Sequence, residues 1–146
     1  MTFVGVDPGA SGGIALFAGG VYTLFRMPDT ETDLSTLLRA CAGPCRAFYE
    51  RLPMGHPDAN PSSMAKLHRN AGVAVGLALA FGWTLSEVPP QEWQGHFKLG
   101  TRAAWGNRWK AHIKDVAQKL HPDVPGITLK TADALLILDY GLHLSR

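Results

Sequence analysis

The chain has few of the features that stabilise small secreted domains or anchor proteins in membranes. It contains two cysteines, Cys41 and Cys45, whose spacing fits neither a redox motif with two intervening residues nor a zinc site with further ligands. We therefore expect reduced thiols and a cytoplasmic location. No secretory leader is visible at the N-terminus, and the longest apolar stretch, residues 72–83, is too short to span a bilayer.

Net charge is also small, at +2, but its distribution is uneven. Charged residues make up 18% and hydrophobic residues 46% of the chain, which excludes disorder and predicts one globular domain spanning residues 1–146. Basic residues concentrate in segment 96–130: Lys98, Arg102, Arg108, Lys110, Lys114, Lys119 and Lys130, against Asp115 and Asp123. That segment is either a surface that meets phosphates or a solvated helix face.

Hydrophobic patterns and turn residues predict five strands, over residues 2–6, 14–17, 21–26, 46–50 and 83–88. They predict helices after Asp33, from a Ser62 cap to about Phe81, over 107–120 and over 131–144. Residues 53–61 and 91–106 are expected to be irregular. Three antiparallel strands followed by alternating helices and strands indicate an α/β fold, in which a mixed sheet has three antiparallel and two parallel strands and helices on both faces.

Three acids stand at the ends of predicted elements. Asp7 follows the first strand, Glu50 follows the fourth, and Asp133 begins the last helix within a very apolar run. Each has an ordinary structural explanation: Asp7 as a turn residue, Glu50 as an ion-pair partner of Arg46 or Arg51, and Asp133 as a charge favoured by the helix dipole. None of these explanations accounts for all three acids at once.

Two strand ends and one helix start can bring three carboxylates to one point. Such a cluster repels itself unless hard divalent cations neutralise it, and Mg²⁺ prefers oxygen ligands of this kind. Two such ions, about 3.5–4 Å apart, activate a water and stabilise the leaving oxygen in phosphodiester hydrolysis. The pattern therefore favours a metal-dependent nuclease.

The sequence resembles the RuvC family of Holliday junction resolvases, in its short phage-type form. The opening Val4-Gly5-Val6-Asp7-Pro8-Gly9, with Gly12-Gly13-Ile14-Ala15, is similar to the first family motif. Phe48-Tyr49-Glu50 resembles the second acidic strand. Pro89 and Trp93, before a lysine-rich helix ending in Leu120-His121-Pro122, resemble a pattern of the short forms. Ala132-Asp133-Ala134-Leu135-Leu136-Ile137, extended by Tyr140-Gly141, resembles the C-terminal signature.

The resemblance implies a ribonuclease H-like fold, a homodimer, two Mg²⁺ or Mn²⁺ ions, and paired nicks at a four-way DNA junction. It also implies that Asp7, Glu50 and Asp133 are the catalytic and metal-binding residues. One position departs from the family, because Lys130 stands where a fourth acid or a histidine is common. Asp139 is a poor substitute, since it falls on another face of the last helix.

Further contacts with DNA are expected from the basic segment. The candidates for backbone contacts are Lys98, Arg102, Arg108, Lys110, Lys114 and Lys130. Trp93, Phe97 or Trp105 either stacks on an unpaired base or packs in the core. The helix over 62–81 carries Gly72 and Gly76 on a surface of small residues, which allows close approach to a sheet or a partner helix.

Other functions remain open. A different ribonuclease H-like nuclease would act on RNA–DNA hybrids or flaps, and a junction-binding module would lack catalysis. Sugar kinases and heat-shock-chaperone ATPases also open with a strand, an aspartate and a glycine-rich turn, but 146 residues are too few for their two-lobed architecture.

Overall fold

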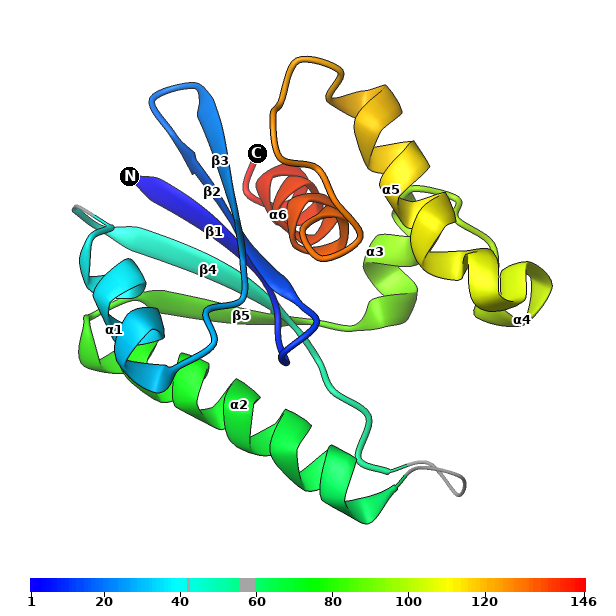
Figure 1. Ribbon diagram of the computed structural model, residues 1–146. Helices are drawn as coiled ribbons and strands as arrows, with labels where there is room; N and C mark the ends of the chain where they lie inside the picture. The colour runs from blue at the N-terminus through cyan, green and yellow to red at the C-terminus, as the bar shows by residue number, and fades with distance from the viewer. Residues whose placement is uncertain (42, 56–59) are drawn as a thin grey trace.

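A five-stranded mixed sheet lies between two helical layers (Figure 1). The computed structural model describes residues 1–41, 43–55 and 60–146. The strands are β1 (Thr2–Asp7), β2 (Gly13–Ala18), β3 (Val21–Arg26), β4 (Cys45–Glu50) and β5 (Thr84–Val88), in the order β3-β2-β1-β4-β5. β1, β2 and β3 pair antiparallel, whereas β4 is parallel to β1 and β5 is parallel to β4. The predicted strand directions are confirmed.

The helices are α1 (Glu31–Arg39), α2 (Pro61–Ala80), α3 (Pro90–His96), α4 (Arg102–Trp105), α5 (Trp109–Leu120) and α6 (Ala132–Leu144), with a 3-10 turn, η1, over Gly106–Arg108. α1 and α2 cover one face of the sheet, and α6 covers the other (Figure 1). Among the described residues, no helix is both long enough and apolar enough to cross a membrane.

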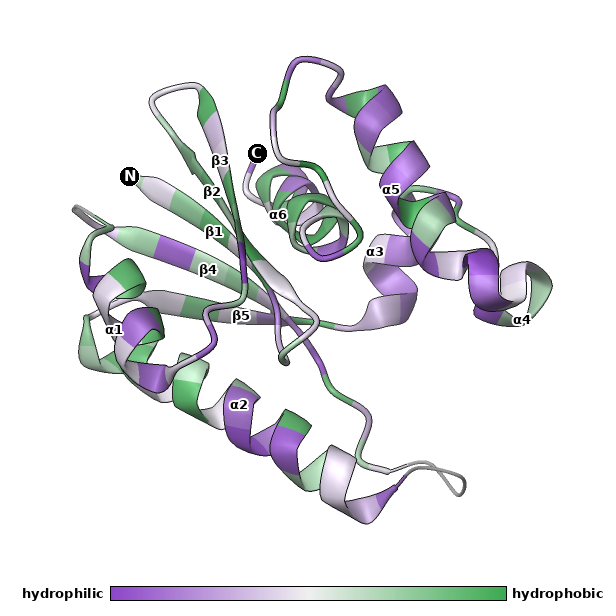
Figure 2. Cartoon of the chain, in the orientation of Figure 1, coloured by the Kyte–Doolittle hydropathy of each residue, from purple (hydrophilic) through white to green (hydrophobic). Residues whose placement is uncertain are grey.

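Side chains of β1 alternate between two cores. Val4 and Val6 pack with the α1 and α2 residues Leu34, Leu38, Ala74 and Ala78. Phe3 contacts the opposite core, which contains Phe48 from β4 and the apolar run of α6. α6 lies between the sheet and α5, which explains why residues 132–138 are all buried and why its hydrophobic residues are not confined to one stripe (Figures 1 and 2).

The prediction of an irregular segment over 91–106 is wrong, because α3 and α4 form there. Pro90 occupies the first turn of α3, where its missing N–H is not needed, so the Pro-Pro pair ends β5 and starts a helix. α3 is short and buries only Trp93, which leaves no repeating apolar pattern to detect.

The predicted helix starts also shift. Asn60, rather than Ser62, caps α2, and its side chain accepts hydrogen bonds from the backbone N–H groups of Ser62 and Ser63. Thr30 caps α1, which therefore begins before Asp33. The remaining element ends lie within two residues of their predicted positions. The predicted loop over 53–61 lies partly outside the described residues.

Gly141 of α6 allows the helix to lie directly on the Phe48 ring. A Cβ atom added at Gly141 would come within 2.2 Å of that ring. We expect Gly141→Ala to destabilise the protein by about 1–3 kcal/mol in urea unfolding, because the core is already filled. Gly95→Ala is the matched control in α3, where an added Cβ meets nothing within 4 Å. It should instead stabilise the protein by about 0.5–1 kcal/mol. Equal effects of the two substitutions would contradict this account of α6 packing.

Candidate active site

Asp7 and Glu50 lie at the same edge of the sheet. Asp7 is the last residue of β1, and Glu50 is the last residue of the neighbouring parallel strand β4. The register pairs Val6 with Tyr49, so the next residue on each strand is one of the two acids. Parallel strands end at a common edge, which is the reason that acids far apart in the sequence become neighbours.

α6 brings Asp133 to this edge through a close backbone contact. A Cβ atom at Gly5 would lie 2.2 Å from the carbonyl oxygen of Ala134, so glycine is required for α6 to rest on β1. Asp133 stands in the first turn of α6 and is buried, with 6% of its surface exposed. The three predicted acids therefore come together, and the charges of Asp133 and Glu50 both act on Asp7.

Lys110 of α5 provides the nearest positive charge. Its ammonium lies 2.8 Å from Asp133 Oδ2, to which it donates a hydrogen bond, and 3.8 Å from Asp7 Oδ2. Burial alone would lower the pKa of Lys110, but the charges of Asp133 and Asp7 outweigh it, and the pKa is raised. Lys110, predicted as a DNA contact, is thus part of the acid cluster.

The pKa values of two acids in the cluster are raised, first by burial and in addition by the charges of neighbouring acids. Burial, followed by the charge of Asp133, raises the pKa of Asp7 to about 7, despite the opposing effect of Lys110. Burial also raises the pKa of Glu50, against the effect of a hydrogen bond from Trp93. One ammonium does not compensate three carboxylates, so the cluster retains a demand for positive charge.

This cluster opens to the surface through two adjoining hollows of about 580 and 390 Å³. Both are lined by Glu50, Arg102 and Lys110; Asp7 lines the first and Asp133 the second. Arg102 thus lies near the acids, where its charge partly opposes the burial that raises the pKa of Glu50. Lys66 and Asn70 of α2 also line the first hollow.

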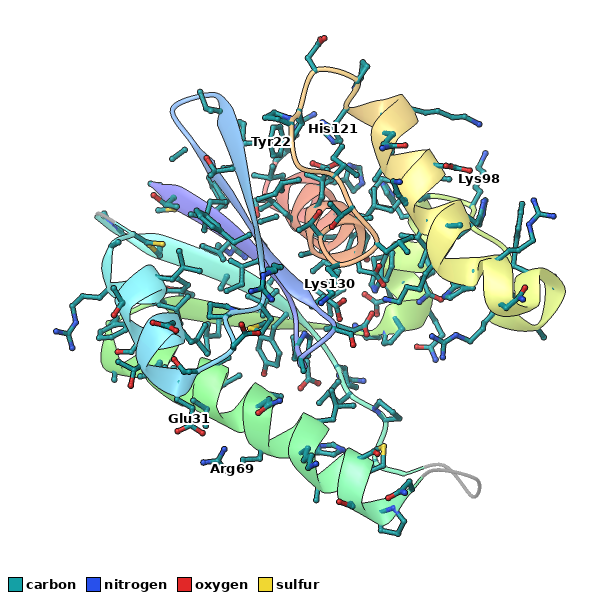
Figure 3. The ribbon with its side chains drawn as sticks, viewed as in Figure 1. Tyr22, Glu31, Arg69, Lys98, His121 and Lys130 are labelled. Carbon is teal, nitrogen blue, oxygen red and sulfur yellow. The ribbon has the colours of Figure 1, made fainter. Side chains whose placement is uncertain are left out.

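The other predicted DNA contacts lie outside these hollows. Lys98, Arg108 and Lys130 are exposed, and Lys114 is partly exposed. Figure 3 shows Lys130 close to the start of α6 and Lys98 beside α5. Of the three aromatic candidates for base stacking, Trp93 is completely buried, so it packs in the core. Trp105 stacks on His112, with ring centroids 3.8 Å apart, and Phe97 contacts His96.

Asp139 is confirmed to lie on another face of α6. It accepts a hydrogen bond from the Tyr22 hydroxyl at 2.9 Å and pairs with His121. These contacts tie α6 to β3 and to the loop after α5, and Figure 3 shows Tyr22 and His121 next to each other. Asp139 therefore supports the fold and does not join the acid cluster.

Comparison with known proteins gives a structural likeness without a sequence match. No protein-family model matches the chain, and no curated protein matches its sequence. A solved structure of T. thermophilus RuvC in complex with a Holliday junction substrate matches with a TM-score of 0.68 at 14% identity, covering 100% of this chain and 96% of that one. A Thermus thermophilus RuvC structure matches with a TM-score of 0.62 at 13% identity, covering 99% and 97%.

The chain has a RuvC-like fold. The ribonuclease H-like architecture expected from the sequence is therefore confirmed. At such low identity the likeness concerns the course of the backbone alone, and the chemistry of the site depends on the side chains of this chain.

The acid cluster fits a divalent cation in its chemistry. Asp133 Oδ1 is buried without a hydrogen-bond partner among the described residues, which is costly for a carboxylate unless a cation contacts it. As the side chains stand, the described residues contain no group of three or more His, Cys, Asp or Glu side chains arranged to hold a metal ion. The Lys110 ammonium takes the position between Asp7 and Asp133, and a cation binding there requires Lys110 to move aside.

The raised pKa of Asp7 predicts a pH-dependent stability of the metal-free protein. Because the folded state binds this proton more tightly than the unfolded state, the stabilisation is present below pH 4 and is lost as pH rises through about 7. Asp7→Asn should therefore be more stable than the wild type at pH 8 in EDTA, by about 1–4 kcal/mol, with the difference shrinking towards pH 4.

Thermal unfolding at pH 4, 6 and 8 measures this difference. Asp115→Asn, at an exposed position of α5, is the control and should follow the wild type at every pH. If the difference in stability between Asp7→Asn and the wild type were the same at pH 4 and pH 8, the raised pKa of Asp7 would be refuted.

Proposed function

We propose that this chain is a divalent-cation-dependent endodeoxyribonuclease that resolves four-way DNA junctions by paired phosphodiester hydrolysis. The observation that carries the proposal is the convergence of Asp7, Glu50 and Asp133 at one sheet edge, beneath a surface hollow and with unbalanced negative charge. The RuvC-like fold supports it, since one similar structure is of RuvC in complex with a Holliday junction substrate.

Asp7, Glu50 and Asp133 are the proposed ligands of Mg²⁺ or Mn²⁺, with two ions in the complete site. When bound there, such ions would supply an activated water and positive charge to offset that developing on the phosphate and the leaving oxygen. Lys110 neutralises part of the cluster in the free protein. Once displaced from Asp7 and Asp133, its ammonium is available to contact a phosphate oxygen at the same edge.

The surrounding cations supply the proposed contacts with the DNA backbone. Arg102 lines both hollows, and its charge acts on Glu50. Lys98, Arg108, Lys114 and Lys130 present further positive charge outside them. Contacts of this kind position a nucleic acid without reading bases, which suits recognition of a branched shape. Binding should therefore weaken steeply with added salt.

Cleavage assays on labelled DNA test the proposed activity. With Mg²⁺ or Mn²⁺, the protein should introduce symmetric nicks into a synthetic four-way junction, and EDTA should abolish them. Asp7→Asn should bind the junction with near wild-type affinity and cut it at least 100-fold more slowly, because one ligand oxygen is lost. Equal cutting by Asp7→Asn would remove the metal mechanism.

The choice of substrate separates the remaining alternatives. A flap DNA, an RNA–DNA hybrid and a linear duplex of the same sequence are assayed beside the junction. Preferred cutting of the hybrid or the flap would assign a different ribonuclease H-like nuclease. Tight junction binding without cutting under any cation would assign a binding module.

Paired nicks require two active sites, and we propose that a homodimer supplies them through α2. Gly72 and Gly76 are exposed on α2, and a side chain added at either position would meet nothing within 4 Å. Leu79, also on α2, is a large apolar residue that is 58% exposed. Small residues at these positions allow another helix to approach closely, as in a two-fold symmetric interface.

Gly76→Leu tests dimer formation without disturbing the fold of the protomer. Because the added side chain faces open space within the protomer, the substitution should leave the folded protomer intact while blocking close approach of a second α2. We expect at least a tenfold weaker dimer by sedimentation equilibrium. Gln118→Leu, at an exposed position of α5, is the control and should sediment as the wild type. An unchanged dimer in Gly76→Leu would place the interface elsewhere.

A further inference from the structure

Trp93 of α3 is completely buried, and its one polar group is directed at the acid cluster. The indole N–H donates a hydrogen bond to Glu50 Oε2 at 2.8 Å. An indole is a donor only, and a buried donor requires an acceptor. Here the acceptor is a proposed metal ligand on another element, so the contact constrains α3 and β4 together.

The support of Glu50 differs from that of the other two acids. Asp7 and Asp133 share the ammonium of Lys110, a flexible side chain that is 38% exposed and has to leave when another cation enters. Trp93 is neutral, rigid and enclosed by core residues such as Phe48 and Leu135. It therefore holds Glu50 without competing with a cation for the site.

The hydrogen bond also distinguishes the two oxygens of Glu50. Oε2 accepts the indole N–H, whereas no hydrogen bond to Oε1 is formed among the described residues. Oε1 thus keeps its lone pairs for a cation. A neighbouring donor that fixes the orientation of a carboxylate ligand generally raises the affinity of a metal site.

We propose that Trp93 is a positioning residue that fixes Glu50 through Oε2 and leaves Oε1 to bind the divalent cation. This inference rests on the proposed nuclease function, and it makes Glu50 the fixed ligand around which Asp7 and Asp133 adjust. A residue that only filled space would need its ring and not its N–H.

Trp93→Phe tests this distinction, because it keeps an aromatic ring in the core and removes the donor. Trp83→Phe is the matched control: Trp83 is also buried, at 5% exposure, but lies in the core on the opposite face of the sheet. Isothermal titration with Mn²⁺ measures the affinity of the full chain and its variants. We expect Trp93→Phe to bind Mn²⁺ about 10–100-fold more weakly than the wild type and Trp83→Phe to bind it normally.

A second measurement follows the hydrogen bond itself, in case Trp93→Phe does not fold. In a ¹H–¹⁵N spectrum the four tryptophans give four indole signals. Glu50→Gln should move the Trp93 signal, because a charged acceptor becomes neutral, and should leave the Trp83 signal in place. A Trp93 signal that does not move in Glu50→Gln overturns the inference.

The outcomes for the inference and for the nuclease proposal can be told apart. Wild-type Mn²⁺ affinity in Trp93→Phe, or equal losses in both Trp→Phe variants, overturns the positioning role whether or not junctions are cut. Selective loss of Mn²⁺ affinity in Trp93→Phe supports it. If that loss accompanies a wild type that binds Mn²⁺ but cuts no DNA, the cation site stands and the nuclease proposal fails.

Discussion

Mutual repulsion among Asp7, Glu50 and Asp133 is the constraint on which the site depends. Three carboxylates at one partly dry edge cannot all remain ionised without positive charge nearby. One ammonium, from Lys110, lies beside them. The pKa of Asp7 nevertheless stays raised, first by burial and then by the charge of Asp133. The residual demand for positive charge is the basis of the proposed divalent-cation site and, through it, of the proposed contact with phosphates.

Close packing of α6 on the sheet creates that repulsion. Gly5 and Gly141 both lie where an added Cβ would overlap a neighbour, so the helix backbone approaches β1 and the Phe48 ring directly. The same approach that buries the apolar run of α6 carries Asp133 to the strand ends. Stability and chemistry are therefore coupled at this contact: loosening α6 would relieve the acids and also open the core.

The supports around the acids differ in mobility. Trp93 holds Glu50 from within the core, and the Tyr22–Asp139–His121 group anchors α6 further along its length. Lys110 enters from α5 on a flexible side chain. A site that has both rigid and flexible neighbours can keep its shape while its counter-ion changes, as the proposed uptake of a divalent cation requires.

The sequence by itself determined the five strands, their directions and four of the helices, and it singled out the three acids that the fold brings together. Strand periodicity, turn residues and acids at element ends are local signals. Tertiary structure decided what those residues contact. No local pattern predicts that Lys110 lies between Asp7 and Asp133. Nor does one predict that Trp93, a candidate for base stacking, donates a hydrogen bond to Glu50. Both contacts join elements that meet only after the chain folds. α3 was not predicted for a related reason. Its single buried residue is recognisable as a core position only from its contacts in the folded protein.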